Sequence, residues 1–166
     1  ICMKIIIAPD SFKGSLSAFE VAKSIQRGII KIDKTIETVI VPMADGGEGT
    51  VQSLIDASDG EIIELVAHDP LFREINSFYG IMGDGKTAVI EMAAASGLPL
   101  LTPEERNPLK TTTYGTGELI KDALNRGCQK FIIGLGGSAT NDGGCGMAQA
   151  LGVKFFDKNG GEVGFG

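Results

Sequence analysis

The sequence Lys-Phe-Ile-Ile-Gly-Leu-Gly-Gly-Ser-Ala-Thr-Asn-Asp-Gly-Gly-Cys-Gly, residues 130–146, passes from an apolar run directly into a loop of glycines and small polar residues. Phe131, Ile132 and Ile133 form a continuous apolar run, which is typical of a strand covered on both faces. The glycines that follow allow backbone N–H groups to approach an anion closely. The stretch therefore predicts a buried strand that ends in a ligand-binding loop.

The polar residues of this loop suit a polyphosphate with its metal ion. Ser138 and Thr140 add hydroxyl donors, Asn141 adds an amide, and Asp142 is a carboxylate that can bind a divalent cation. The alternative is a tight strand-to-helix turn without a ligand, although such a turn needs only one or two glycines and no Asn-Asp pair.

The composition favours an enzyme that binds small molecules. The chain has 166 residues, of which 43% are hydrophobic and 22% charged, as in an ordinary soluble globular protein. The net charge is −6 and no segment concentrates Lys and Arg, so neither nucleic acid nor an acidic membrane surface is expected as a partner. Three dispersed cysteines and the absence of a signal-peptide pattern at residues 1–7 predict a cytoplasmic location.

The first part of the chain repeats a strand–loop–helix pattern. Residues 4–8 and 35–41 are apolar, β-branched runs that end at prolines, and each is followed by a glycine-containing loop. Ser17 and Glu20 form a capping-box pattern at the start of the first helix. We therefore predict a Rossmann- or flavodoxin-like α/β domain with a parallel sheet over residues 1–69, with both loops at the carboxyl edge of that sheet.

Both loops contain candidate ligand-binding residues. Lys13, with Ser11 and Ser15 nearby, is a reasonable phosphate contact at a helix start, but a solvated lysine beside a capping serine explains the same spacing. Asp45 and Glu48, on a glycine-rich turn, suit magnesium or proton transfer. Their alternative role is the ordinary preference of acidic residues for a helix N-terminus.

The strand–loop–helix pattern ends near residue 69. A third strand is predicted at 62–66, and the segment His68-Asp69-Pro70-Leu71 interrupts the repeat, with His68 expected to be a loop residue rather than a catalyst. Two further strands, 75–82 and 86–92, flank a hairpin-type turn at 83–85. We predict a second, mixed α+β domain over residues 70–166.

The remainder of that domain contains two helices and a final hairpin. Helices are predicted at 116–126, with Gly127 as its C-terminal cap, and at 144–151. A strand at 153–156 and turn residues at 157–161 predict a hairpin whose returning strand begins at 162–165. We expect both domains to be incomplete and the chain to be part of a longer protein.

One nucleotide-binding motif matches by spacing alone. Gly80, Gly85, Lys86 and Thr87 fit the P-loop pattern G-x-x-x-x-G-K-[ST]. A P-loop requires a strand that ends before the first glycine and a helix that starts at the lysine. Here Gly80 lies inside an extended run, and residues 88–90 are rich in β-formers. We therefore do not predict a P-loop.

Several long motifs, in order, resemble the glycerate kinase family. They are Ala-Pro-Asp-Ser-Phe-Lys-Gly-Ser at 8–15, Pro-Met-Ala-Asp-Gly-Gly-Glu-Gly-Thr at 42–50, Ala-Val-Ile-Glu-Met-Ala-Ala-Ala-Ser-Gly-Leu at 88–98, Asn-Pro-Leu-Lys-Thr-Thr-Thr-Tyr-Gly-Thr-Gly-Glu-Leu-Ile at 107–120 and Gly-Gly-Ser-Ala-Thr-Asn-Asp-Gly-Gly at 136–144. The resemblance covers essentially the whole chain. It implies ATP-dependent phosphorylation of D-glycerate to 2-phosphoglycerate, on two α/β domains with the site in the cleft between them.

The resemblance makes the loop residues candidate site residues, because phosphoryl transfer requires mainly positioning and charge neutralisation. Asp10 is the candidate for orienting or deprotonating the glycerate hydroxyl, and Lys13 for stabilising the migrating charge. The complete assignment is catalytic Asp10, Lys13 and Asp45; substrate- or phosphate-binding Ser11, Ser15, Gly46, Gly47, Gly136, Gly137, Ser138, Thr140 and Asn141; and metal-binding Asp142 and Glu48, with ATP and Mg²⁺ as cofactors.

Alternatives remain at this point. A noncatalytic phosphate- or nucleotide-binding module would use the same loops without an acceptor site. A glycerate kinase that yields 3-phosphoglycerate, or a different small-acid kinase or phosphatase with a P-loop at 80–87, are further possibilities. Members of the resembled family are longer than this chain, so we expect little or no activity from residues 1–166 alone.

Overall fold

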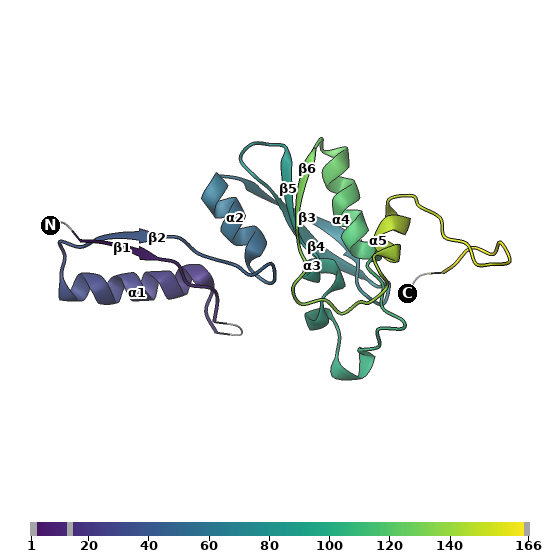
Figure 1. Cartoon of the computed structure of the whole chain (residues 1–166), viewed down its shortest axis with the longest axis horizontal. Helices are drawn as coiled ribbons and strands as arrows, with labels where there is room; N and C mark the ends of the chain where they lie inside the picture. The colour runs from purple at the N-terminus through teal and green to yellow at the C-terminus, as the bar shows by residue number, and fades with distance from the viewer. Residues whose placement is uncertain (1–2, 13–14, 165–166) are drawn as a thin grey trace. The chain divides into compact units, whose positions relative to one another are not determined.

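The computed structural model describes residues 3–12 and 15–164 and contains two compact units, Ile1–Asp45 and Gly46–Gly166 (Figure 1). Both units combine helices with strands, so the predicted α/β class is confirmed. The units divide after Asp45 because β3 (Glu61–His68) pairs with β4 (Glu74–Ile81) along its whole length in the second unit. The predicted domain boundary after residue 69 remains a prediction about the longer protein.

The first unit is a strand–helix–strand motif. β1 (Lys4–Ile7) and β2 (Glu37–Ile40) are parallel, with Lys4 opposite Glu37 and Ile7 opposite Ile40. The connecting helix α1 (Ala18–Ile32) begins with the predicted capping box, in which Glu20 N donates to Ser17 Oγ at 3.3 Å and Ser17 N donates to Glu20 Oε2 at 2.8 Å. This cap satisfies two backbone donors that the first turn of the helix leaves unpaired.

The second unit is built on a four-stranded sheet in the order β3-β4-β5-β6. β3, β4 and β5 (Thr87–Glu91) are antiparallel neighbours, and β6 (Lys130–Gly134) runs parallel to β5. The predicted hairpin turn between β4 and β5 is confirmed, since Gly85 has φ +65° and donates its N–H to Met82 O at 2.9 Å. Lys86 precedes a strand rather than a helix, so the P-loop context is absent.

Helices cover both faces of this sheet. α2 (Thr50–Ser58) contributes Val51 and Ile55 to a cluster with Val89, whereas α4 (Tyr114–Asn125) packs against a second cluster that includes Ala88 and Ile90. Because successive side chains of a strand point to opposite faces, α2 and α4 lie on opposite sides of β5. The other helices are α3 (Ala93–Ser96), α5 (Cys145–Ala150) and the 3-10 turns η1 (Leu98–Leu100) and η2 (Pro103–Glu105).

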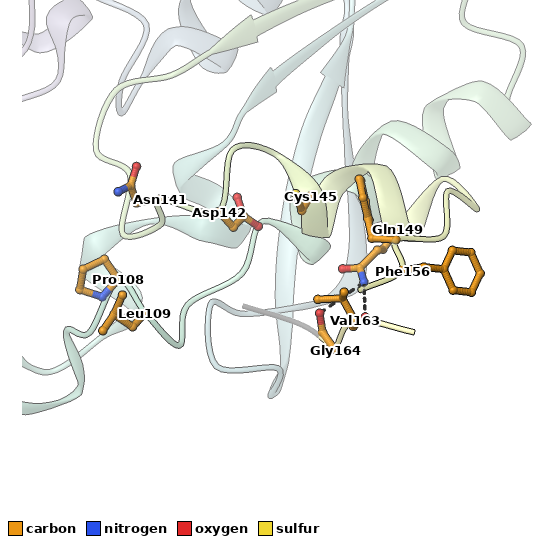
Figure 2. A pocket seen from close by; sticks show the side chains of 10 residues that line it. Pro108, Leu109, Asn141, Asp142, Cys145, Gln149, Phe156, Val163 and Gly164 are labelled. Carbon is orange, nitrogen blue, oxygen red and sulfur yellow. Dashed lines mark hydrogen bonds between the residues drawn. The ribbon is translucent and has the colours of Figure 1, made fainter. Parts of the chain in front are cut away.

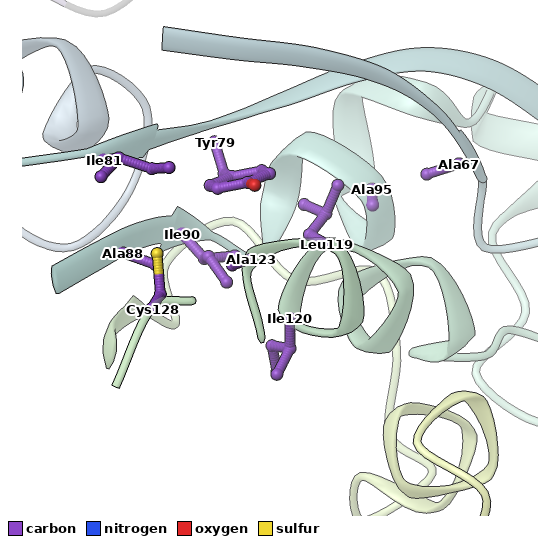
Figure 3. Packing of buried hydrophobic residues seen from close by; sticks show 10 residues of the cluster. All are labelled: Ala67, Tyr79, Ile81, Ala88, Ile90, Ala95, Leu119, Ile120, Ala123 and Cys128. Atoms are coloured by element: carbon purple, nitrogen blue, oxygen red, sulfur yellow. The ribbon is translucent and has the colours of Figure 1, made fainter. Parts of the chain in front are cut away.

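The larger core lies beneath α4 (Figure 3). Tyr79, Ile90 and Leu119 are completely buried in it. The Tyr79 hydroxyl donates to Asp122 Oδ2 at 2.8 Å, which satisfies its one buried polar atom. Burial, followed by this contact with Asp122, raises the pKa of Tyr79, so the phenol stays protonated at neutral pH.

Two sequence expectations are wrong in this unit. Ile132 and Ile133 are 41% and 37% exposed, because β6 pairs with β5 alone among the described strands and lies at the edge of the sheet. Residues 153–156 do not form a strand with a returning partner, since Phe156 and Glu162 make only an isolated bridge. Phe165 lies outside the described residues. None of the described helices has both the length and the apolar character needed to cross a membrane.

The packing beneath α4 makes a stability prediction. Leu119→Ala removes a fully buried side chain, which should lower the free energy of unfolding by about 2–5 kcal/mol through lost apolar burial and a residual cavity. The matched control is Leu109→Ala, because Leu109 is 85% exposed and a surface change of this kind costs within about 0.5 kcal/mol. Urea unfolding followed by circular dichroism measures both, and equal values would contradict the described core.

Candidate functional site

Two glycine-rich loops of the second unit touch where β5 and β6 end. Gly136 N donates to Gly46 O at 3.0 Å, so the loop before α2 and the loop after β6 share a backbone hydrogen bond. A Cβ at Gly134 would lie 2.3 Å from Gly46 O, and one at Gly136 would lie 2.8 Å from Gly47 Cα. Real Cβ atoms do not approach backbone this closely, so the contact requires glycine at both positions.

A buried carboxylate lies beneath this contact. Glu91 is the last residue of β5 and only 4% exposed, and its Oε1 accepts the Val51 N–H at 2.7 Å. Burial raises the pKa of Glu91 and the charge of Glu48 adds to this rise, while N–H donors at the start of α2 oppose it; the net shift is upward. Sequence reasoning missed this residue, although a single acid at the end of the apolar run 88–90 was a usable signal.

The loop after β6 is fixed on its other side by the segment that follows β5. Met92 N donates to Gly134 O at 3.0 Å, Leu98 N to Gly137 O at 2.9 Å, and Ala139 N to Ser96 O at 2.9 Å. Gly137 has φ +76°, a conformation that side-chain-bearing residues rarely adopt. The loop is therefore held in place by backbone bonds before any ligand binds.

The predicted hydroxyl donors lie together. Ser138 Oγ and Thr140 Oγ1 are 3.1 Å apart, and Thr140 N donates to Ser138 Oγ at 3.1 Å. Both residues are half-buried, whereas the neighbouring Asn141 is exposed. Two hydroxyls and an amide on one rigid turn can donate hydrogen bonds to phosphate oxygens.

Asp142 joins the starts of α4 and α5. Its Oδ2 accepts from Thr113 N at 2.9 Å, Thr113 Oγ1 at 2.8 Å and Gly146 N at 3.1 Å, and its Oδ1 accepts from Gly144 N at 2.9 Å. Burial alone would raise the pKa of Asp142, but these donors together lower it below the ordinary value of 3.8. Its role as a metal ligand remains a prediction, and the described residues contain no group of three or more His, Cys, Asp or Glu placed to hold a metal ion.

The other predicted site residues lie in the first unit and in the loop before α2. In the first unit, Asp10 Oδ1 accepts from Ser11 N at 2.6 Å, and Ser15 N donates to Phe12 O at 2.8 Å. Asp45 ends this unit and is exposed. Glu48, in the second unit, is also exposed, and Lys13 lies outside the described residues. The structure thus brings Gly46 and Gly47 to Gly136, while the catalytic assignments of Asp10, Lys13 and Asp45 remain predictions.

A pocket of about 510 Å³ opens beside Asn141 and Asp142 (Figure 2). Its other walls come from Pro108 and Leu109, from α5, and from the segment that includes Phe156 and Val163. Sequence reasoning did not predict it, because residues 108–109 meet residues 141–164 only after folding.

The comparisons with known proteins decide the family. The family model described as the glycerate kinase family matches residues 5–166. The chain belongs to the glycerate kinase family. It is 60% identical to a glycerate kinase of Haemophilus influenzae and 58% identical to a glycerate 2-kinase of Escherichia coli, each over 164 residues. These alignments cover 99% of this chain and 43% of each relative, so the chain spans less than half the length of these curated kinases.

A solved structure agrees with this membership. The fold matches the crystal structure of a Salmonella typhimurium LT2 protein assigned as glycerate kinase 2, with a TM-score of 0.88 and 52% sequence identity over 100% of this chain and 44% of that one. All five motifs that suggested a glycerate kinase fall within the matched range 5–166. The interlocked loops are therefore part of the glycerate kinase fold.

His68 has a structural position in this fold. It is the last residue of β3 rather than a loop residue, and its Nδ1 lies 2.9 Å from Glu118 Oε1 on α4. Its ring stacks on Phe72 with centroids 4.3 Å apart. These contacts tie the end of β3 to α4.

The contacts of Asp142 predict a pH-dependent stability effect. Asp142→Asn replaces one acceptor oxygen by an NH₂ group, which cannot accept from the N–H groups around it, so we expect a loss of about 1–3 kcal/mol at pH 7. Because the folded-state pKa lies below 3.8, the ionised group stabilises the fold above that pH, and the difference should shrink as the pH falls through the lowered pKa.

Urea unfolding of both proteins between pH 7 and pH 3 measures this difference. Asp56→Asn is the matched control, because Asp56 is exposed on α2 and its change should cost within about 0.5 kcal/mol. Equal stability of the wild-type and Asp142→Asn proteins at pH 7 would show that the four contacts contribute nothing net.

Proposed function

We propose that the full-length protein containing this chain transfers a phosphoryl group from ATP to D-glycerate and forms 2-phosphoglycerate. The observation that carries the proposal is the pair of interlocked glycine loops, in a chain whose family match spans both of them. The name of the Escherichia coli relative, glycerate 2-kinase, at 58% identity, favours the 2-position as acceptor.

The second unit suits the phosphate-binding half of this reaction. Phosphoryl transfer depends on rigid positioning and on donors aimed at developing charge. The turn at 136–141 offers backbone N–H groups, the Ser138 and Thr140 hydroxyls and the Asn141 amide, and it is fixed by backbone bonds to residues 92–98. We assign the phosphate oxygens to this turn.

The first unit supplies the proposed acceptor chemistry. The proposal gives Asp10 the task of orienting or deprotonating the glycerate hydroxyl, which a carboxylate within hydrogen-bonding reach can do. Ser11 and Ser15 would bind substrate oxygens, and Lys13 and Asp45 would complete the catalytic set. A bacterial metabolic enzyme of this kind fits the cytoplasm, where both substrates occur.

Magnesium would enter with the nucleotide, since Mg²⁺ is usually held by one or two carboxylates together with substrate phosphates. Glu48 fits this use, because it is an exposed carboxylate on the loop before α2. Asp142 fits poorly, because four donors of its own chain already occupy its two oxygens. The bound ion would offset phosphate charge.

The direct test is an ADP-release assay of the full-length protein with D-glycerate. We expect turnover of about 1–100 per second, as is typical of kinases, and a product that enolase consumes directly, as it does 2-phosphoglycerate. A product that needs phosphoglycerate mutase before enolase would establish the 3-phosphate instead. ATP binding without turnover on D-glycerate, with L-glycerate as control, would favour a noncatalytic module. Residues 1–166 alone should show little or no turnover.

The role of Asp10 has its own test. In the full-length protein, Asp10→Asn should lower kcat by about 100-fold or more, because the amide cannot accept the hydroxyl proton. Asp33→Asn is the matched control, because Asp33 is exposed in the same unit and only accepts from Thr35 after the end of α1. Steady-state kinetics decide the matter, and unchanged turnover in Asp10→Asn removes this residue from the mechanism.

A further inference from the structure

We propose that Glu91 is a positioning residue for phosphoryl transfer. Its buried carboxylate accepts from the N-terminus of α2 and thereby keeps the loop 46–50 against Gly134–Gly136. The turn 136–141 then stays in position to bind the substrate phosphate. The inference rests on the proposed function and assigns different tasks to the two glycine loops. The loop before α2 is a support, and the loop after β6 is the phosphate-binding surface.

The first step is the cap on α2. A helix leaves its first N–H groups without intrahelical partners, and the N-cap residue here is Gly49, which has no side chain to accept them. Glu91 accepts from Val51 N at 2.7 Å, and the backbone N–H groups of Gly49 and Thr50 lie near enough to oppose the rise of its pKa. A carboxylate from the adjacent strand thus takes the place of both a capping side chain and a bound anion.

The start of α2 already has a carboxylate beside it. The N-terminus of a helix carries a partial positive charge that favours one anion. Glu91 already lies there, and Glu48 is close enough to add to its electrostatic field. A substrate phosphate at the same place would face the Glu91 carboxylate and would find the Val51 N–H already used. Phosphate is therefore expected at the turn 136–141 and not at the start of α2.

Backbone contacts link the two glycine loops. Glu91 is paired in register with Gly134, and Gly136 N donates to Gly46 O. The loop 46–50 lies so close to Gly134 and Gly136 that no Cβ fits between them, so a shift of this loop would disturb the hydrogen bond from Gly136 N to Gly46 O. Glu91 therefore supports the phosphate-binding turn from the side of α2, in addition to the backbone bonds from residues 92–98.

The test is Glu91→Gln in the full-length protein. The isosteric amide removes the charge and turns one acceptor into a donor that faces N–H groups. We expect faster hydrogen exchange at residues 49–51 and a kcat lowered by about 10–100-fold, as for an approximately 1 Å misplacement. The KM values for ATP and D-glycerate should change by less than about threefold, because the groups of the turn 136–141 that bind ground-state phosphate remain.

The matched control is Glu64→Gln, which makes the same chemical change at an exposed position of β3 in the same sheet. It should alter neither the exchange at 49–51 nor kcat. If Glu91→Gln does not fold, Glu91→Asp carries the test, because it keeps the charge but shortens the reach to Val51 N.

Three outcomes would overturn the proposal for Glu91. Unchanged exchange at 49–51 in the variant overturns the proposal, and so does faster exchange with unchanged kcat, since the loop position would then not affect transfer. A KM raised as strongly as kcat is lowered would place phosphate at α2 itself and also overturn it. If the wild-type protein does not phosphorylate glycerate, the proposed function fails separately, and the exchange data still show whether Glu91 holds the loop.

Discussion

The architecture of the second unit depends on a close approach of two backbones. Gly46 and Gly47 lie against Gly134 and Gly136 at distances that leave no room for a Cβ. The approach brings the loop before α2 onto the end of β6, although about 90 residues separate them in the chain, and it fixes both at the same edge of the sheet. The turn 136–141 begins at this contact, and Glu91 is paired in register with Gly134 beside it.

Two carboxylates stabilise that arrangement in related ways. Glu91 and Asp142 both accept backbone N–H groups from segments distant in sequence, which offsets the cost of burying a charge. Their pKa values nevertheless move in opposite directions. Burial dominates at Glu91, with a smaller rise from Glu48, whereas the donors from Thr113, Gly144 and Gly146 outweigh burial at Asp142. Both carboxylates are held by backbone donors of their own chain, which favours a rigid structure around the turn 136–141.

Local features of the fold could be predicted from the sequence, and non-local ones could not. The Ser17–Glu20 capping box and the hairpin at Gly85 are confirmed, because each is decided by residues a few positions apart. The burial of β6 and the strand at 153–156 were predicted wrongly, because the sequence of a strand does not specify which other strands pair with it. The four donors to Asp142 likewise became visible only in the folded chain, and its role as a metal ligand stays a prediction.

The sequence by itself determined the family, the α/β class and the identity of the glycine loops, since motif order and short-range patterns carry that information. Only the tertiary structure decided that the two glycine loops contact each other. Three hydrogen bonds join residues between 29 and 90 positions apart: Gly136 N to Gly46 O, Val51 N to Glu91, and Thr113 N to Asp142. Such contacts follow from how strands and helices pack, because steric fit between distant segments is a property of the folded chain and not of any local pattern.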